Sequence, residues 1–168
     1  MPKHSFRLLN APYLRSFIFG VEDSLVSTVG LLSGVALANV PRETILITGV
    51  VLIFVEAFSM AAGTFLTESS VEDYVRQRDV TTKMPFNVGI VMFLSYFVSG
   101  FVPLGPYVFL PVATAFPVSV ALSILALFVL GAWSAGMSRI SVMKNALRMA
   151  VIGGGAIVVG ILAGRLVG

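Results

Sequence analysis

Residues 44–66 have the sequence TILITGVVLIFVEAFSMAAGTFL, an almost unbroken apolar run with a single acidic residue, Glu56. A helix needs about 20 apolar residues to cross the hydrocarbon core of a bilayer, and this run is long enough. The rest of the chain is similar: 57% of its 168 residues are hydrophobic, 11% are charged, and the mean hydropathy is +0.98. Because ordinary soluble domains contain about 25% charged residues, the sequence predicts a membrane protein.

Four further apolar runs accompany this one, and short polar or proline-containing stretches separate them. Residues 1–168 are therefore expected to form a single all-α transmembrane domain with five membrane-spanning helices, which leaves no room for a second domain. The expected spans lie at about 17–38, 44–66, 86–107, 112–136 and 147–167.

Three helix boundaries are predicted from proline and from polarity. Pro41 is expected to open the second helix. The cluster of Pro103, Gly105 and Pro106 is expected to break the outer end of the third span. The stretch from Thr67 to Lys83 is predicted to be a polar connection.

The basic residues predict the orientation in the membrane. Only Arg42 and Arg165 fall on one side, and the positive-inside rule places the other nine in the cytosol. The N-terminus is therefore expected in the cytosol and the C-terminus, after an odd number of spans, outside. The nine residues are Lys3, Arg7, Arg15, Arg76, Arg78, Lys83, Arg139, Lys144 and Arg148.

Three carboxylates, Glu22, Asp23 and Glu56, are predicted to lie within the first two spans. A charge at the centre of a membrane helix costs about 2.5–3.5 kcal/mol on insertion scales, so such residues indicate a functional site. Asp23 follows the start of the first span by six residues, and Met60 precedes the end of the second span by six. In neighbouring antiparallel helices the two meet at one depth, about 9 Å from the cytosolic edge. Glu56 lies one turn from Met60 on the same face.

This set of donors predicts a site for a divalent transition metal. Carboxylates alone suit Mg²⁺ or Ca²⁺, whereas a thioether adds a softer donor that better fits Fe²⁺ and its first-row neighbours. Protons and a dication compete for carboxylate oxygens, so exchange of metal for protons is expected. We predict Asp23, Met60, Glu56 and Glu22 as metal ligands.

Structural alternatives remain open for these residues. A single Met among seven is most often a packing or lipid-facing residue. Asp23 or Glu22 could instead pair with Arg15 or bind a proton, and adjacent helical residues point about 100° apart, so the two acids need not share a face.

Two further patterns also have two interpretations. Glu68, Glu72 and Asp73 are most simply a solvated helix end, and collection of metal at the cytosolic mouth is the lesser alternative. Small residues recur at four-residue spacing in the first and fifth spans, which permits either internal packing or a dimer seam. They are Gly30, Gly34 and Ala38, and Gly160, Gly164 and Gly168.

Three motifs resemble those of the vacuolar iron transporter family. Residues 19–26, FGVEDSLV, followed by GLLSG at 30–34, resemble its first-span pattern F-G-x-x-D-G-L-V. Residues 59–63, SMAAG, resemble its S-M-x-x-G, and residues 103–107, PLGPY, resemble its P-L-x-P-Y. The resemblance covers nearly the whole chain in the right order. It implies a five-span homodimer that carries Fe²⁺, and often Mn²⁺, out of the cytosol in exchange for protons, with Asp23 and Met60 as ligands near the dimer interface.

The chain also departs from that family's pattern. Ser24 replaces the usual Gly, Ser16 stands where plant-type members have an acid, and Glu22 is an added acid. Leu52 stands where those members have a second-span Glu, and Glu56, one turn away, is the candidate to substitute for it. The second connection is too short for the glutamate-rich cytosolic metal-binding domain of plant-type members, so the chain resembles a short member that lacks this domain.

The expected function is proton-coupled export of Fe²⁺, with Mn²⁺ and other divalent transition metals as further substrates. No nucleophile elbow, Walker loop, HExxH or nucleotide motif is present, so no enzyme activity is expected. We expect no cofactor, since Fe²⁺ is cargo, and no nucleic-acid partner. The expected location is multi-pass in the cell membrane, or in a vacuolar-type membrane of a eukaryote. The alternatives are a non-transporting membrane scaffold or assembly subunit, and a transporter of a different cation.

Overall fold

A computed structural model describes residues 3–38, 40–77, 83–138 and 140–167. Arg78 and Arg139, which belong to the predicted charge pattern, and Gly168, at the end of the predicted glycine series, lie outside the described residues. The described chain contains five helices and no strand: α1 (Lys3–Leu37), α2 (Arg42–Arg76), α3 (Lys83–Phe109), α4 (Val112–Ser138) and α5 (Val142–Val167). All five are long and apolar enough to cross a membrane, which confirms the predicted all-α, five-span fold class.

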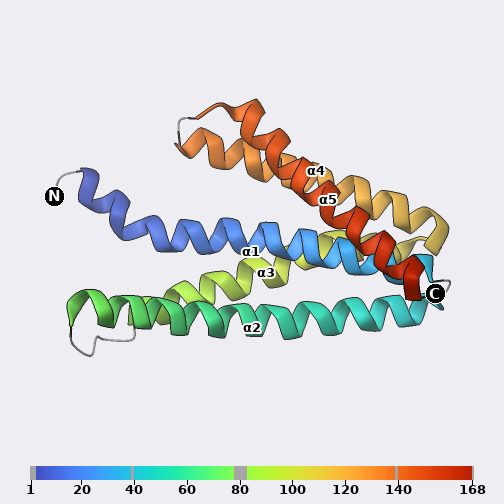
Figure 1. Ribbon diagram of the computed structural model, residues 1–168, viewed down its shortest axis with the longest axis horizontal. Coiled ribbons are helices and arrows are strands. Elements are labelled where there is room, and N and C mark those ends of the chain that lie inside the picture. The colour runs from blue at the N-terminus through green and yellow to red at the C-terminus, as the bar shows by residue number, and fades with distance from the viewer. Residues whose placement is uncertain (1–2, 39, 78–82, 139, 168) are drawn as a thin grey trace.

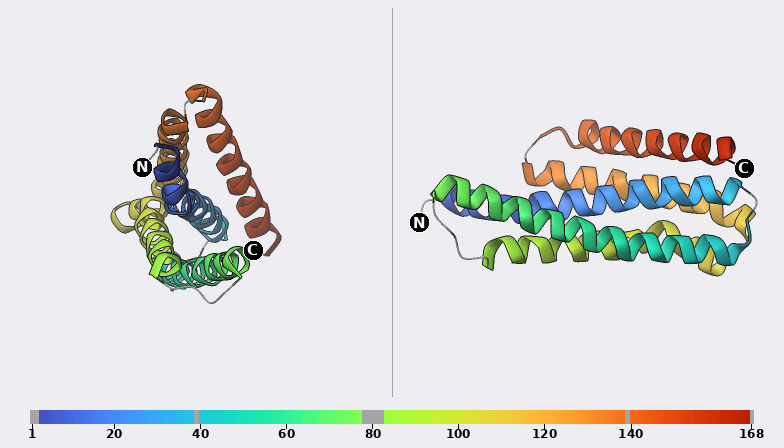
Figure 2. Two further views of the ribbon diagram at one scale, coloured as in Figure 1. Left: turned by 90° about the vertical axis from the view of Figure 1, so that its left-hand side faces the viewer. Right: turned by 60° about the horizontal axis from the view of Figure 1, so that its bottom comes forward.

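The helices form an elongated bundle in which consecutive helices run in opposite directions (Figure 1). The beginning of α1, the end of α2, the beginning of α3, the end of α4 and the beginning of α5 lie at one end, which we name the N-terminal end. Helix α1 occupies the middle and packs against α3 and α5, while α3 lies between α1 and α2 (Figure 2). The first two spans are therefore neighbours of a common third helix as well as of each other.

The second helix is longer than the sequence predicted. The polar connection was expected to begin at Thr67, but α2 continues to Arg76 and ends at Gln77, whose φ of 50° is left-handed. Residues 67–76 contain no Pro or Gly, and Glu72 pairs with Arg76 four residues later at 2.8 Å, which favours helix. At a rise of about 1.5 Å per residue the helix is about 50 Å long, so it extends well beyond a hydrocarbon core of about 30 Å.

The expected break in the third span was also wrong, because α3 continues through Pro103 and Pro106 to Phe109. Membrane helices tolerate proline when neighbouring groups satisfy the freed backbone. Pro103 and Pro106 free the carbonyl oxygens of Ser99 and Val102. Ser119 of α4 donates a hydrogen bond in the same stretch, to the Pro103 carbonyl oxygen at 2.6 Å, and so joins α4 to α3. At the end of the helix, Arg42 Nε donates to the Tyr107 carbonyl oxygen at 2.7 Å, and the Arg42 guanidinium also donates to Val108.

The glycines of α1 and α5 pack against each other within the chain. A Cβ on Gly34 would lie 2.6 Å from the carbonyl oxygen of Gly160, and a Cβ on Gly164 would collide with the backbone of Gly34. Of the two interpretations that the spacing allowed, internal packing therefore accounts for these glycines.

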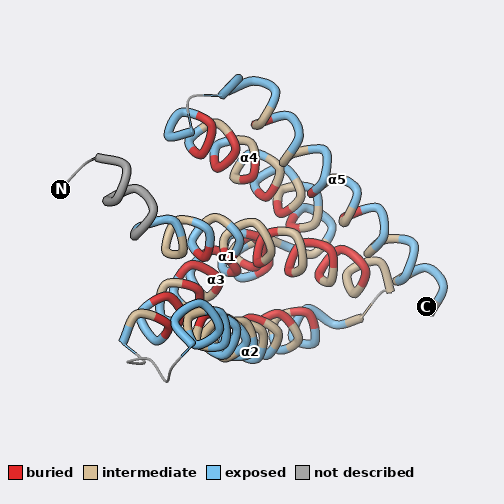
Figure 3. The backbone as a smooth tube through the Cα atoms, turned by 60° about the vertical axis from the view of Figure 1, so that its left-hand side comes forward, coloured by how far each residue is buried: buried red, intermediate tan, exposed pale blue. Residues whose placement is uncertain are grey.

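Burial differs between the helices, and one apolar cluster lies toward one end of the bundle. A cluster around Leu32, Ile53 and Leu104 fills the end opposite the N-terminal end, with Ile45, Tyr107 and Ala115. Half of the residues in an apolar 18-residue stretch of α1 and of α3 are buried, compared with 17% in the corresponding stretch of α5. Figure 3 shows the exposed faces turned outward on α2 and α5. These apolar outer faces suit contact with lipid.

Candidate functional site

Two carboxylates from different helices approach each other inside the bundle. Asp23 on α1 lies close enough to Glu56 on α2 for the charge of one carboxylate to act on the other, and both side chains are partly buried. Like charges held close together in a medium of low dielectric constant repel strongly, so a cation or a proton stabilises this pair.

Tyr96 of α3 lies near these two carboxylates, and it was not among the residues that the sequence predicted for the site. Its phenol oxygen lies 2.7 Å from Ser27 Oγ, and the charges of Asp23 and Glu56 both act on it. Ser24 Oγ donates a hydrogen bond to the Tyr96 carbonyl oxygen at 2.6 Å. The two serines therefore fix α1 to α3 on either side of the turn that follows Asp23.

Glu22 has different neighbours. The charges that act on it are those of Asp23 beside it and of Arg148 on α5. Adjacent helical residues diverge by about 100°, which explains why one acid meets α2 and the other meets α5. Among the described residues, no three His, Cys, Asp or Glu side chains gather as a group that could hold a metal ion. The charge of Asp23 therefore acts on both Glu22 and Glu56, but the three acids do not form one cluster.

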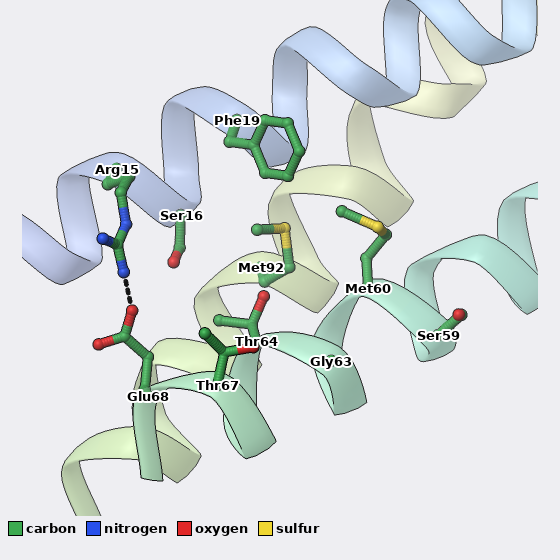
Figure 4. Close-up of a pocket in the computed structure, with 10 residues that line it drawn as sticks. All are labelled: Arg15, Ser16, Phe19, Ser59, Met60, Gly63, Thr64, Thr67, Glu68 and Met92. Carbon is green, nitrogen blue, oxygen red and sulfur yellow. Dashed lines mark ion pairs between the residues drawn. The ribbon is translucent and has the colours of Figure 1, made fainter. Parts of the chain in front are cut away.

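Met60 lies one turn from Glu56, in a cavity of about 660 Å³ between α1, α2 and α3. Phe19, one turn before Asp23, and Met92 of α3 line the same cavity, whereas Asp23 does not. Figure 4 shows the Met60 side chain directed toward Phe19, with the Met92 sulfur nearby. The cavity therefore begins one turn from the Asp23–Glu56 pair and extends toward the N-terminal end. Hydropathy alone could not indicate Met92, since it depends on how α3 is rotated.

Arg15 and Glu68 form an ion pair at the far side of this cavity (Figure 4). This corrects two sequence-based interpretations. Arg15 pairs with Glu68 and not with Glu22 or Asp23, and Glu68 is buried, with 7% of its surface exposed, instead of being part of a solvated helix end. The partner that buries it lies far away along the chain, so the local sequence did not reveal the contact.

Five apolar helices, two of which carry partly buried carboxylates, define a multi-pass helical membrane protein with acidic side chains in its first two spans. The model of the VIT family matches residues 14–84 and 74–165. The chain therefore belongs to the VIT family, a family of metal-ion transporters and not of enzymes, which confirms the resemblance found in its motifs.

One curated relative is "Vacuolar iron transporter 1" of Tulipa gesneriana. It is 25% identical over 200 aligned positions, which cover 83% of this chain and 81% of the relative. The alignment is longer than the whole chain of 168 residues, so the relative has segments that this chain lacks. The two matched segments of the family model meet at residues 74–84, around the α2–α3 connection.

Proposed function

We propose that this chain carries a divalent transition metal, with Fe²⁺ as the leading substrate, out of the cytosol in exchange for protons. The observation that carries the proposal is the approach of Asp23 on α1 to Glu56 on α2 inside the bundle. The name of the tulip relative supports iron as the cargo. Mn²⁺ and other first-row dications are further candidates, because they share these ligand preferences.

The proposed ligands are Asp23, Glu56, Met60 and Glu22. Asp23 and Glu56 supply oxygens on a shared path, and Met60 supplies a softer sulfur one turn away. Arg148 competes for Glu22, so we expect Glu22→Gln to weaken metal binding less than Asp23→Asn does. Water or a second copy of the chain would complete the coordination sphere, and we propose a homodimer for this reason.

The positions of an apolar cluster and of the cavity with Met60 support a direction of transport. The apolar cluster around Leu32 and Leu104 closes one end, and the cavity with Met60 lies toward the N-terminal end. If the N-terminal end is cytosolic, as the charge pattern predicts, this state is accessible from the cytosol. Metal would then enter beside Met60 and reach Asp23 and Glu56 before release outside.

The test is metal flux in proteoliposomes under an imposed pH gradient, with wild type and Asp23→Asn compared. The isostere keeps the size of the side chain and removes its charge, so transport should stop while the protein still folds, as judged by monodisperse elution and an unchanged helical CD spectrum. A membrane scaffold would tolerate the substitution and show no metal flux in either form. Fe²⁺, Mn²⁺, Co²⁺ and Mg²⁺ tested in parallel give the selectivity.

A further inference from the structure

The ion pair between Arg15 and Glu68 is asymmetric. The Glu68 side chain is 8% exposed, whereas the Arg15 side chain is 68% exposed. The carboxylate is therefore a fixed part of the bundle, and the guanidinium reaches it from the surface on a flexible side chain. Because a buried carboxylate without a cation is strongly unfavourable, this position requires a positive charge, and Arg15 supplies it in this state.

The same cavity can hold more than the guanidinium. Its volume of about 660 Å³ exceeds the space of a dication with a first shell of six waters, since a water occupies about 30 Å³. The hydroxyls of Thr64 and Thr67 line the wall between Glu68 and the inner thioethers of Met60 and Met92. A cation that replaced Arg15 would thus meet hard oxygen donors first and soft sulfur donors further in.

A second carboxylate, one turn further along α2, is also paired with a partly exposed arginine. Glu72 Oε1 pairs with Arg76 at 2.8 Å, while Glu72 Oε2 is buried without a hydrogen-bond partner among the described residues. A buried carboxylate oxygen without a donor is a favourable contact for a cation. Glu68 and Glu72, four residues apart, lie on one face of α2.

We propose that Glu68 is a binding site for the incoming hydrated divalent cation, separate from the Asp23–Glu56 pair, and that Arg15 is its tethered counter-ion, which the cation displaces. The inference rests on the proposed function, because it assumes that a dication enters at this end. Arg15 acts as an intramolecular competitor: it keeps Glu68 neutralised while the site is empty and lowers the apparent affinity for metal. Arg15 also makes the cavity selective for dications. A monovalent cation gains less Coulomb energy from Glu68 than a dication does, and that energy is too small to displace the guanidinium of Arg15.

The test is equilibrium binding of Mn²⁺ to the full-length protein in nanodiscs, followed by loss of the EPR signal of aqueous Mn²⁺. Arg15→Gln should tighten binding about two- to fivefold, as expected for removal of a partly exposed ionic competitor. Arg15→Lys should change it less than twofold, and Glu68→Gln should weaken it. In the Glu68→Gln background, Arg15→Gln should have no further effect, because the competitor acts only through Glu68. Lys144→Gln, which removes an exposed positive charge from the α4–α5 side, is the matched charge control and should leave the affinity unchanged.

Thermal unfolding of the same samples separates binding from structure. If Arg15→Gln and Glu68→Gln both lower the melting temperature and leave the Mn²⁺ affinity unchanged, the pair is a structural tie and the proposal is wrong. If Arg15→Gln alone does not fold, the double variant with Glu68→Gln is measured in its place. The proposal requires that this double variant bind Mn²⁺ as weakly as Glu68→Gln does. Wild-type affinity in the double variant would show that the proposal is wrong.

Repeating the titrations in the Asp23→Asn background distinguishes this inference from the proposed function. If Glu68-dependent binding persists in that background, the Glu68 site is separate from the Asp23–Glu56 pair. If it is lost, the two are not separate sites and this part of the proposal is wrong. Flux that survives Asp23→Asn contradicts the proposed path without affecting the Glu68 result.

Discussion

A Cβ atom on Gly34 would lie 2.6 Å from the carbonyl oxygen of Gly160, so α1 and α5 cross almost in backbone contact. The same contact continues at Gly30 and Gly164. It holds the helix that carries Glu22 and Asp23 against the helix that carries Arg148, which explains how a charge on α5 acts on Glu22.

Gly34→Ala should therefore destabilise the protein. The obstacle is backbone, which cannot rotate away, so the helices must separate, at a cost of about 1–3 kcal/mol in the free energy of unfolding. Gly155→Ala in α5 is the matched control, since a Cβ there meets nothing within 4 Å and Ala favours helix. Unfolding in mixed micelles measures both. Equal, small effects of the two substitutions would contradict the close contact at Gly34. A change of oligomeric state with unchanged stability for Gly34→Ala would point to a dimer seam.

Tyr96→Phe should weaken metal binding while the fold is retained. The substitution removes the hydroxyl that lies 2.7 Å from Ser27 Oγ and on which the charges of Asp23 and Glu56 act. The ring stays, so packing between α1 and α3 is kept. We expect a loss of affinity of several-fold for Co²⁺ or Mn²⁺, measured by equilibrium titration. Tyr74→Phe, at an exposed position near the end of α2, is the control and should bind metal as wild type does. Equal affinities for all three proteins would remove the Tyr96 hydroxyl from the site.

The sequence predicted the five spans because bilayer thickness sets the length of an apolar run, as residues 44–66 illustrate. It did not predict the helix ends. Hydropathy indicates where an apolar run leaves the membrane, whereas a helix can continue beyond that point in polar residues, as α2 continues past Thr67 to Arg76. The acids of the candidate site could be predicted, because a charge in an apolar run is conspicuous. Tyr96 and Met92 could not, because their approach to α1 depends on helix rotation. The burial of Glu68 depends on a partner from another helix, Arg15.

Met60→Leu should separate a ligand role from a packing role. Leucine keeps the volume and apolar character, so the fold should survive with a change below about 1.5 kcal/mol. Affinity for Fe²⁺ or Co²⁺ should fall more than affinity for Mg²⁺, because only the softer ions gain from a thioether. Met137→Leu, at an exposed position at the end of α4, is the control. Equal losses for all metals would assign Met60 to packing.

The topology can be tested because the chain contains no Cys. A single Cys in place of Arg76, at the N-terminal end of the bundle, should react with a membrane-impermeant maleimide only from the cytosolic side. A Cys in place of Thr44, at the start of α2, should react only from outside. The expectation rests on the nine-to-two distribution of basic residues. Labelling of the Arg76 position from outside alone would reverse the orientation, and with it the proposed direction of transport.

Proton coupling is the last prediction, and it follows from the approach of two carboxylates inside the bundle. Asp23 and Glu56 repel each other when both are ionised, so either a proton or a dication relieves the repulsion, and the two compete for the same oxygens. Metal binding should release protons into a weakly buffered solution, and metal affinity should fall as the pH is lowered.

An acidic compartment outside would load protons onto the emptied carboxylates and return them to the cytosol, so metal efflux should speed up when the outside is acidified. Asp23→Asn should abolish both the flux and the proton release. The measurement is Fe²⁺ flux in sealed vesicles, with the membrane potential clamped so that only the pH gradient varies. Flux that ignores the gradient would rule out antiport. The metal site itself would still stand in that case if Asp23 and Met60 substitutions removed binding, because a passive carrier needs the same ligands but no proton to return.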